Sequence, residues 1–363
     1  MSLLSSIWSA MQGKLFPILE EEIGELSDKE KQFIRVCELC NIGKYIHLFN
    51  GSLFGRPKKE RLCLSMAFVA KAVYNFSNTK ILIDYIKNNA TLRRLCGWES
   101  KRDIPSESTF SRAFDEFAHG ELPQIIHENM VKKHCKEKLA GHVSRDSTPI
   151  SSREKPKKKP KKKKKAKAKR GRPKKGEIRQ PKPWTKLQIQ LDRTYEENIK
   201  DIPTCCDTGT KKDSKGYKRT WIGYKLHVDC IDGDIPVSVL LSSASTHDSQ
   251  LAIPLAQMTS ERVTNLYDLM DAAYDSKEIH EISERLNHVP VIDSNKRKGN
   301  KKEFNPAKKV RYKQRSSAER IMSNLKDNYG GNNVRVKGDK KVMAHLMFGI
   351  IAMTADQLFR LLM

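Results

Sequence analysis

The sequence lacks a run of about 20 apolar residues, the usual length of a membrane-spanning helix. The nearest stretch, residues 342–355 (VMAHLMFGIIAMTA), contains a histidine and is too short, so it predicts a buried terminal helix instead. The N-terminus (MSLLSSIWSAMQGKLF) lacks the basic n-region and the small-residue cleavage site of a secretory signal. These absences argue against a membrane-bound or secreted protein and predict a cytoplasmic one.

Disulfide-framework spacing is also missing, although the chain has eight cysteines. Cys37 and Cys40 form a lone CxxC motif, and Cys205 and Cys206 are adjacent. Neither pair has the second matching pair that a tetrahedral zinc site requires. We therefore expect reduced thiols, as is usual inside cells.

Acidic residues are scarce relative to basic ones. The chain has 69 Lys and Arg against 43 Asp and Glu, which gives a formal net charge of +26. Residues 155–175 (KPKKKPKKKKKAKAKRGRPKK) contain 13 Lys, 2 Arg and no acid, so this segment carries +15 and the rest of the chain +11. Such a surplus predicts a polyanionic partner, with nucleic acid ahead of a membrane surface.

The apolar spacing of residues 1–138 predicts an all-α N-terminal domain. Within it, residues 104–117 (IPSESTFSRAFDEF) predict a helix capped by Ser106 or Ser108. The apolar face of this helix would consist of Phe110, Ala113, Phe114 and Phe117. Exposed Ser108 and Arg112 at its start are typical of a helix that reads DNA. A plain bundle helix is an equally valid interpretation.

Residues 139–363 have a different sequence pattern, which predicts short strands that alternate with helices. The expected strands are 141–150, 221–231, 235–245, 263–274 and 289–294, and the expected helices are 247–258, 276–287 and 312–326. A DGD turn joins the second and third strands as a hairpin. This order predicts an α/β domain with a mixed sheet flanked by helices.

The last of these helices (YKQRSSAERIMSNLK) carries a row of functional side chains. At 100° per residue, Tyr312, Arg315, Glu319 and Lys326 fall within about 60° of one another. The neighbouring arc is apolar and consists of Ala318, Ile321, Met322 and Leu325. A Glu between cations is also common on a solvated helix face with i,i+4 pairs, so the row alone leaves both interpretations open.

Two further carboxylates favour a functional role for the row. Asp146 lies in the first strand of this domain, and Asp271 lies at the end of the fourth, just before a helix. With Glu319 they could converge on one edge of the mixed sheet. Converging carboxylates bind hard divalent ions, which here means Mg²⁺ or Mn²⁺. Two such ions about 4 Å apart would suit phosphodiester chemistry.

The spacing Tyr-x2-Arg-x3-Glu-x6-Lys, met by Tyr312, Arg315, Glu319 and Lys326, resembles the signature of DDE transposases of the insertion-sequence-four type. The segments RDSTPI and DAAYDS resemble the regions of this family that hold its first and second Asp. GYKLH (223–227) and STHDSQ (245–250) are also similar to motifs of this superfamily. The resemblance covers residues 140–363, whereas the N-terminal part resembles the family's helical DNA-end-binding region only loosely.

This resemblance implies an RNase H-like catalytic core in which Asp146, Asp271 and Glu319 bind two metal ions. It also implies that Tyr312, Arg315 and Lys326 hold DNA phosphates. The expected activity is cut-and-paste transposition: cleavage at terminal inverted repeats of double-stranded DNA, then strand transfer into target DNA by a homodimer. The alternatives are an RNase H-like nuclease that does not join DNA and a domesticated DNA-binding protein that has lost its chemistry.

The sequence also departs from some relatives. The gap between Asp271 and Glu319 leaves no room for the β-rich insertion that they carry there. No Trp lies between residues 222 and 363 to stabilise a flipped base, so a DNA hairpin intermediate is in doubt. His247 is a candidate DNA or metal contact, although a helix-starting His beside an Asp is the commoner interpretation.

Residues 151–183 form a Lys-rich insertion directly after the first strand. Within it, Arg170, Gly171 and Arg172 resemble an AT-hook core, which enters the narrow minor groove of A·T tracts. Residues 54–59 (FGRPKK) are a partial copy. We expect a disordered arm that binds DNA non-specifically and with steep salt dependence. The alternatives are a solvated linker and a segment that only resembles a nuclear localisation signal.

Overall fold

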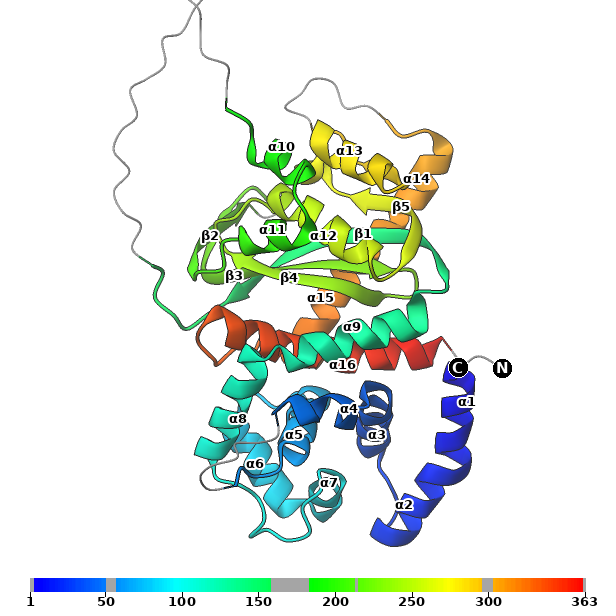
Figure 1. The fold of residues 1–363 in the computed structure, drawn as a ribbon, viewed down its shortest axis with the longest axis vertical. Coiled ribbons are helices and arrows are strands. Elements are labelled where there is room, and N and C mark those ends of the chain that lie inside the picture. Colours follow the sequence, from blue (N-terminus) through cyan, green and yellow to red (C-terminus); the bar gives the residue numbers. More distant parts are fainter. Residues whose placement is uncertain (1–2, 50–56, 158–182, 213–214, 296–302, 362–363) are drawn as a thin grey trace, which may run out of the picture.

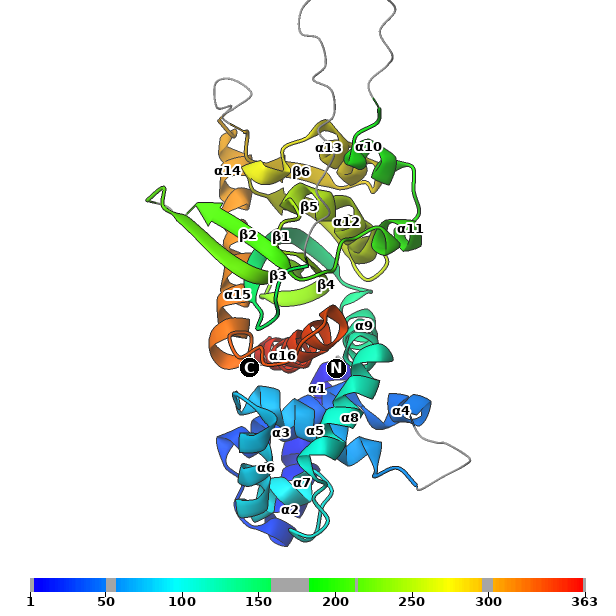
Figure 2. The same ribbon diagram turned by 90° about the vertical axis from the view of Figure 1, so that its left-hand side faces the viewer.

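A computed structural model describes residues 3–49, 57–157, 183–212, 215–295 and 303–361. Figures 1 and 2 show two parts stacked along the long axis, a helical part and a sheet with helices on both faces. The long helix α16 (Asp339–Arg360) lies between these two parts. The predicted fold class, an α/β mixed sheet preceded by helices and consistent with an RNase H-like core, is therefore confirmed.

The N-terminal part is helical throughout its described residues. Its elements are α1 (Leu3–Ala10), η1 (Met11–Leu15), α2 (Phe16–Ile23), α3 (Asp28–Cys40), α4 (Gly43–Ile46), η2 (His47–Phe49), α5 (Arg61–Val73), α6 (Thr79–Asn88), α7 (Ala90–Leu95), α8 (Glu107–His119) and α9 (Leu122–Cys135). Local signals start several of these helices. At α3, for example, Ser27 and Glu30 form a reciprocal capping box.

Helix α8 buries the apolar face that its sequence predicts. Phe110, Ala113, Phe114 and Phe117 are all buried, and the ring of Phe68 on α5 packs against three of them. Ser106 is the N-cap residue, but its side chain makes no capping hydrogen bond to the helix backbone. The start of α8 is therefore held by packing rather than by its cap.

The sheet has six strands: β1 (Leu139–Ser151), β2 (Asp207–Lys212), β3 (Lys218–Ile231), β4 (Ile235–Ser243), β5 (Thr264–Met270) and β6 (Val289–Ile292). Their order is β2-β3-β1-β5-β6, and β4 also pairs with β3. β1 is antiparallel to β3 and parallel to β5, so the sheet is mixed. The hairpin of β3 and β4 is as predicted, whereas β2 was not expected from the sequence.

Strand β3 requires a glycine where three strands meet. Gly223 pairs with Ser151 of β1 on one side and with Asp207 of β2 on the other. Its φ is +150°, and a Cβ there would lie 2.1 Å from the carbonyl oxygen of Ile150. Because the obstructing atom belongs to the backbone, no side-chain movement could relieve the clash.

Helices cover both faces of the sheet, as Figure 2 shows. One face carries α10 (Lys186–Leu191), α11 (Tyr195–Lys200), η3 (Asp248–Leu251), α12 (Ala252–Ser260), η4 (Ala272–Tyr274) and α13 (Lys277–Arg285). The other face carries α14 (Pro306–Tyr312), η6 (Lys313–Arg315) and α15 (Ser316–Asn328). The sequence predicted none of α10, α11 and α14.

The periodicity of residues 312–326 predicts one continuous α-helix, but the structure divides this segment among three elements. Tyr312 ends α14, Arg315 ends the 3₁₀ turn η6, and Glu319 and Lys326 lie on α15. The apolar arc is nevertheless buried as predicted, with Ala318, Ile321, Met322 and Leu325 packed inside. A short 3₁₀ turn changes the local twist without removing the side chains from one side of the chain.

Helix α16 is the predicted buried terminal helix. Its length and composition would allow it to cross a membrane, yet 89% of its most apolar window is buried inside the protein. It packs against α3, α5, α8 and α9 and also against β4. One apolar core therefore runs from the N-terminal helices into the sheet. The predicted division of the chain at residues 138 and 139 stays a prediction.

A buried ion pair locks β1 to β3 at the centre of the sheet. Arg145 and Asp229 are direct cross-strand partners, and the guanidinium donates to both carboxylate oxygens at 2.7 and 2.6 Å. Thr259 of α12 donates a third hydrogen bond to Asp229 at 2.7 Å. Both charged side chains are almost completely buried. Neither charge could be left unpaired there without a large cost.

Removing one partner of this pair should destabilise the whole sheet. We expect Arg145→Met to lower the free energy of unfolding by about 3–5 kcal/mol, because it leaves the Asp229 carboxylate buried and unpaired. The double variant Arg145→Met/Asp229→Leu should recover most of this loss, since it removes both charges. Urea unfolding followed by circular dichroism measures both values. A single variant as stable as the wild type would contradict this role of the pair.

Candidate active site

Strand β1 presents alternate side chains to the two faces of the sheet. Arg145 points into the core beneath α12, so its neighbour Asp146 points to the opposite face, where α15 packs. Ser144 shares that face and donates to the carbonyl oxygen of Gln314 at 2.9 Å. This contact fixes the turn before α15 directly over the strand that carries Asp146.

Asp271 lies beside Asp146 because β1 and β5 run parallel. The last pair in their register is Ser144 with Leu269, and the two acids each lie two residues beyond it. Asp271 caps η4, where its Oδ1 accepts the N–H of Ala273 at 2.9 Å. Oδ1 of Asp146 likewise accepts the N–H of Ser147, at 2.7 Å. Each carboxylate is thus held by its own backbone.

The environment of Asp146 disfavours its negative charge. Burial raises the pKa of this carboxyl group to about 6, and the neighbouring Asp271 carboxylate contributes to the increase. The Ser147 N–H and the more distant cations Lys211 and Arg315 oppose it. A carboxylate pair of this kind gains stability from any added positive charge.

Arg315 lies between two of the three predicted acids. Its guanidinium donates to Glu319 at 2.6 Å and approaches Oδ2 of Asp146 at 3.9 Å. Glu319 is more than half exposed, with 53% of its side chain accessible to solvent. Among the residues that the structure describes, no three His, Cys, Asp or Glu side chains form a group close enough to hold a metal ion.

Lys326 reaches the same face of β1 from two helical turns further along α15. Its ammonium group donates to the hydroxyl of Thr148 at 2.6 Å. Thr148 lies two residues after Asp146 and so shares its face of the sheet. The ammonium group is half-buried, and this burial lowers its pKa. Lys326 is therefore held in a fixed position rather than extended into solvent.

Tyr312 packs against its neighbours at the start of the row. Its ring centroid lies 4.9 Å from that of Phe304 and 5.7 Å from the guanidinium carbon of Arg315. Partial burial raises the pKa of its phenol to about 12, so the hydroxyl is neutral. Tyr312 therefore limits the directions in which Arg315 can turn.

A second group of polar residues lies beneath the acids, and only the motifs GYKLH and STHDSQ point to it in the sequence. Lys225 donates to Asp248 at 2.9 Å, which joins the two motifs GYKLH and STHDSQ. Asp248 also interacts with Ser147, the residue after Asp146. The phenol of Tyr274 is fully buried near Asp146, Asp248 and Asp271, and burial together with these carboxylates raises its pKa. Only packing across the sheet brings these residues together.

The structure describes three of the other predicted residues, at the start of η3 and on α8. His247 is exposed and caps η3 through its ring nitrogen, in agreement with its interpretation as a helix-starting residue. Ser108 and Arg112 are exposed near the start of α8, in the helical part. Arg170, Gly171 and Arg172 lie outside the described residues, as does most of the Lys-rich insertion.

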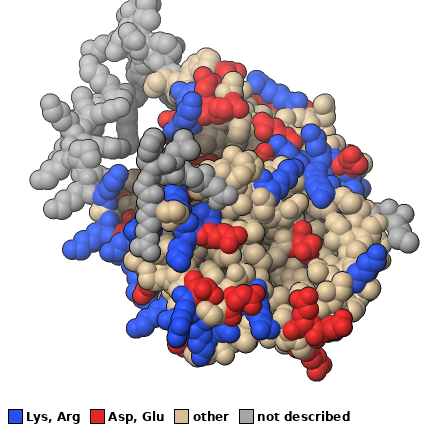
Figure 3. All heavy atoms as spheres, turned by 60° about the horizontal axis from the view of Figure 1, so that its bottom comes forward, with Lys and Arg blue, Asp and Glu red and all other residues tan. Residues whose placement is uncertain are grey.

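The surface of the helical part has charges of both signs. Figure 3 shows Lys and Arg side chains interspersed with Asp and Glu over the face that it displays, without one continuous basic patch. Mixed charges of this kind do not by themselves define a nucleic-acid footprint. The basic surplus of the chain is concentrated elsewhere in the sequence.

Comparison with protein families assigns both parts of the chain. The model of the Transposase DDE domain matches residues 138–355, which include β1, the sheet, α15 and most of α16. The model described as Transposase domain (DUF772) matches residues 21–116 in the helical part. No curated protein matches the chain. Because the first model covers more than half of the sequence, the chain belongs to the transposases with a DDE domain.

Proposed function

We propose that this protein is a transposase of the insertion-sequence-four type, which cleaves DNA at terminal inverted repeats and joins the ends to target DNA. As a DDE transposase it is a transposition enzyme that acts on DNA. The observation that best supports the finer proposal is the position of the Arg315, Glu319 and Lys326 row over the face of β1 that carries Asp146.

Asp146, Asp271 and Glu319 would hold the divalent ions, either Mg²⁺ or Mn²⁺, that DDE transposases generally use. Their oxygen donors suit a hard cation. Burial, together with the neighbouring Asp271 carboxylate, raises the pKa of Asp146, so a bound cation would stabilise the charged form of this side chain. When two such ions are bound, they activate water and stabilise a leaving 3′ oxygen. Glu319 would have to exchange its bond to Arg315 for this role.

The cations of the row would hold DNA phosphates. Once the bond to Glu319 is broken, the Arg315 guanidinium could make a bidentate contact to a phosphate. The ring of Tyr312 would keep this guanidinium near the carboxylates. Lys326 supplies a second positive charge from a fixed position on Thr148. Together they would keep the scissile phosphate in line beside the carboxylates, which is the positional contribution that phosphoryl transfer needs from a protein.

The remaining parts of the proposal concern assembly. Residues 1–138 would bind the transposon ends or pair two copies of the chain, with Ser108 and Arg112 facing the DNA. The Lys-rich insertion, with its AT-hook-like Arg170 and Arg172, would hold DNA non-specifically through its charge. Paired ends require two active sites, so we propose a homodimer on double-stranded DNA, in the cytoplasm beside the nucleoid.

An end-cleavage and joining assay tests the proposal. Labelled DNA that carries the element's own ends is incubated with Mg²⁺ or Mn²⁺ and either the wild type, Glu319→Gln or Glu196→Gln. We expect metal-dependent nicking and joining by the wild type and a loss of about a hundredfold or more in Glu319→Gln, with DNA binding retained. Glu196 is exposed on α11, across the sheet from α15, so its variant should act like the wild type.

The same assay separates the alternatives. Cleavage without joining would favour an RNase H-like nuclease. DNA binding with no chemistry in any variant would favour a domesticated binding protein. Equal cleavage by Glu319→Gln and the wild type would remove Glu319 from the proposed metal ligands.

The hydrogen bond between Thr148 and Lys326 provides a test of positioning. We expect Thr148→Val to slow DNA cleavage by about three- to tenfold, because Lys326 loses its anchor, while the free energy of unfolding changes by about 1 kcal/mol or less. Thr148→Ser keeps the hydroxyl and should retain activity. Cleavage rates and urea unfolding are measured for all three proteins. Equal rates for the Val and Ser variants would show that this bond does not position Lys326.

A further inference from the structure

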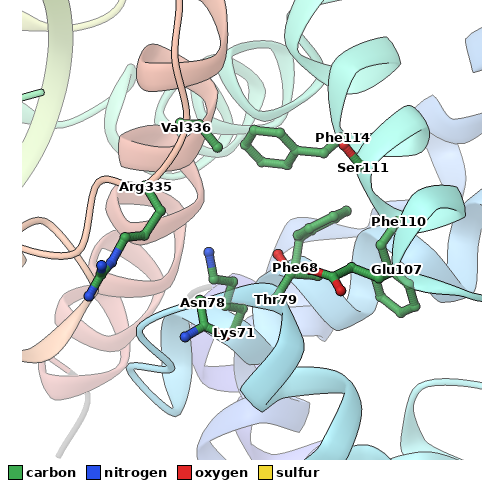
Figure 4. A pocket seen from close by; sticks show the side chains of 10 residues that line it. All are labelled: Phe68, Lys71, Asn78, Thr79, Glu107, Phe110, Ser111, Phe114, Arg335 and Val336. Atoms are coloured by element: carbon green, nitrogen blue, oxygen red, sulfur yellow. The ribbon is translucent and has the colours of Figure 1, made fainter. Parts of the chain in front are cut away.

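A pocket in the helical part combines cationic and polar side chains far from the carboxylates. Its volume is about 220 Å³, and its polar lining consists of Lys71, Asn78, Thr79, Glu107, Ser111 and Arg335. Figure 4 shows these side chains around the pocket together with three phenylalanines and Val336. The lining comes from α5, α6, α8 and the connection between α15 and α16, so segments far apart in the sequence build one site.

Lys71 is the unusual member of this lining. Only 9% of the residue is exposed, and within the described part of the chain its ammonium group has no hydrogen bond or ion pair. Burial lowers its pKa to about 8, so the amine is still mostly protonated at neutral pH. Because burial disfavours the positive charge of Lys71, an anion in the pocket would stabilise it.

Two helices begin at the pocket. Asn78 is the N-cap residue of α6 and Thr79 is its first residue, while Glu107 is the first residue of α8. The free N–H groups and the dipole at such helix starts favour a negatively charged ligand. At α6 the Asn78 side chain caps the backbone by accepting the N–H of Ile81, whereas at α8 the Ser106 side chain makes no such cap.

Arg335 supplies a second cation at the mouth of the pocket. It is exposed, and within the described residues it has no ion pair. Figure 4 shows Arg335 on the opposite side of the pocket from Glu107 and Ser111 of α8. Among the described residues that line the pocket, Glu107 is the only carboxylate, so the two cations leave a net charge of +1 for a ligand to balance.

We propose that this pocket binds a backbone phosphate of DNA between Lys71 and Arg335. The proposal rests on the proposed function, which makes DNA the substrate. The phosphate would accept hydrogen bonds from both cations and from the hydroxyl of Ser111 or Thr79. Such a contact is independent of sequence and fixes the position of the duplex rather than reading its bases.

Through Arg335, the proposed phosphate contact would also affect the candidate active site. Arg335 belongs to the connection that follows α15, the helix with Glu319 and Lys326. From Glu319 to the end of α15 at Asn328 is about 14 Å along the helix axis. DNA held in the pocket would therefore brace the N-terminal helices against the distal end of the helix that carries the proposed catalytic Glu.

The affinity of the full-length protein for a short duplex, measured by fluorescence anisotropy over a range of salt concentrations, tests the site. We expect Lys71→Met and Arg335→Gln each to weaken binding by about three- to tenfold at low salt. In the double variant, log K should fall less steeply with log salt. The magnitude of the slope should decrease by about 0.9 in total, because both cations meet one phosphate. Lys87→Met, an exposed cation at the far end of α6, should bind like the wild type.

Thermal unfolding separates a binding role from a structural one. Lys71→Met should unfold at the same temperature as the wild type or higher, because it removes an unpaired buried charge. A lower unfolding temperature for Lys71→Met would show that Lys71 also has a structural role, and its DNA affinity would then not count. Arg335→Gln changes an exposed residue, so its DNA affinity alone would then decide the site.

The remaining outcomes also decide the question. DNA binding by the wild type with unchanged affinity and slope in Arg335→Gln and the double variant would overturn the site alone. Failure of the wild type to bind any DNA would overturn the proposed function and this site with it. If inorganic phosphate raises the unfolding temperature of the wild type but not of Arg335→Gln, while DNA binding is equal, the pocket takes a free anion and the DNA contact is wrong.

Discussion

The candidate active site depends on strand β1, which places the adjacent charged residues Arg145 and Asp146 on opposite faces of the sheet. Arg145 is buried against Asp229 and Thr259 beneath α12, and this requires Asp146 to face α15. A slip of one residue in the register of β1 would bury Asp146 without a cation and expose Arg145. The ion pair thus fixes the register, and the register fixes the side on which chemistry can take place.

On the face of the sheet that α15 covers, neighbouring carboxylates form a site that favours a bound positive charge. Asp146 and Asp271 lie together at the ends of parallel pairing, and the pKa of Asp146 is raised as a result of burial and of this proximity. Arg315 partly compensates for them, because it contacts Glu319 and approaches Asp146. In the proposed mechanism the same guanidinium would move to a DNA phosphate once metal ions neutralise the carboxylates.

Helix α16 connects this site to the N-terminal helices. It packs against α1, α3, α5, α8 and α9 and against β4, so the two parts share one apolar core. The connection before α16 also carries Arg335 into the pocket of Lys71. The proposed DNA contact in the helical part would therefore be coupled to the position of α15 through packed structure, because both parts share this core.

Local sequence determined the helical N-terminal part, the β3–β4 hairpin, the mixed sheet and the apolar arc of α15, because 3.6- and 2-residue periodicities report which side of an element is buried. It also determined the Tyr312, Arg315, Glu319 and Lys326 row. Only the tertiary structure decided which partners these side chains meet. Arg145 meets Asp229 and Lys326 meets Thr148 across 84 and 178 residues, and the Lys71 pocket combines four distant segments. Such contacts depend on how the elements pack, and no local pattern specifies them.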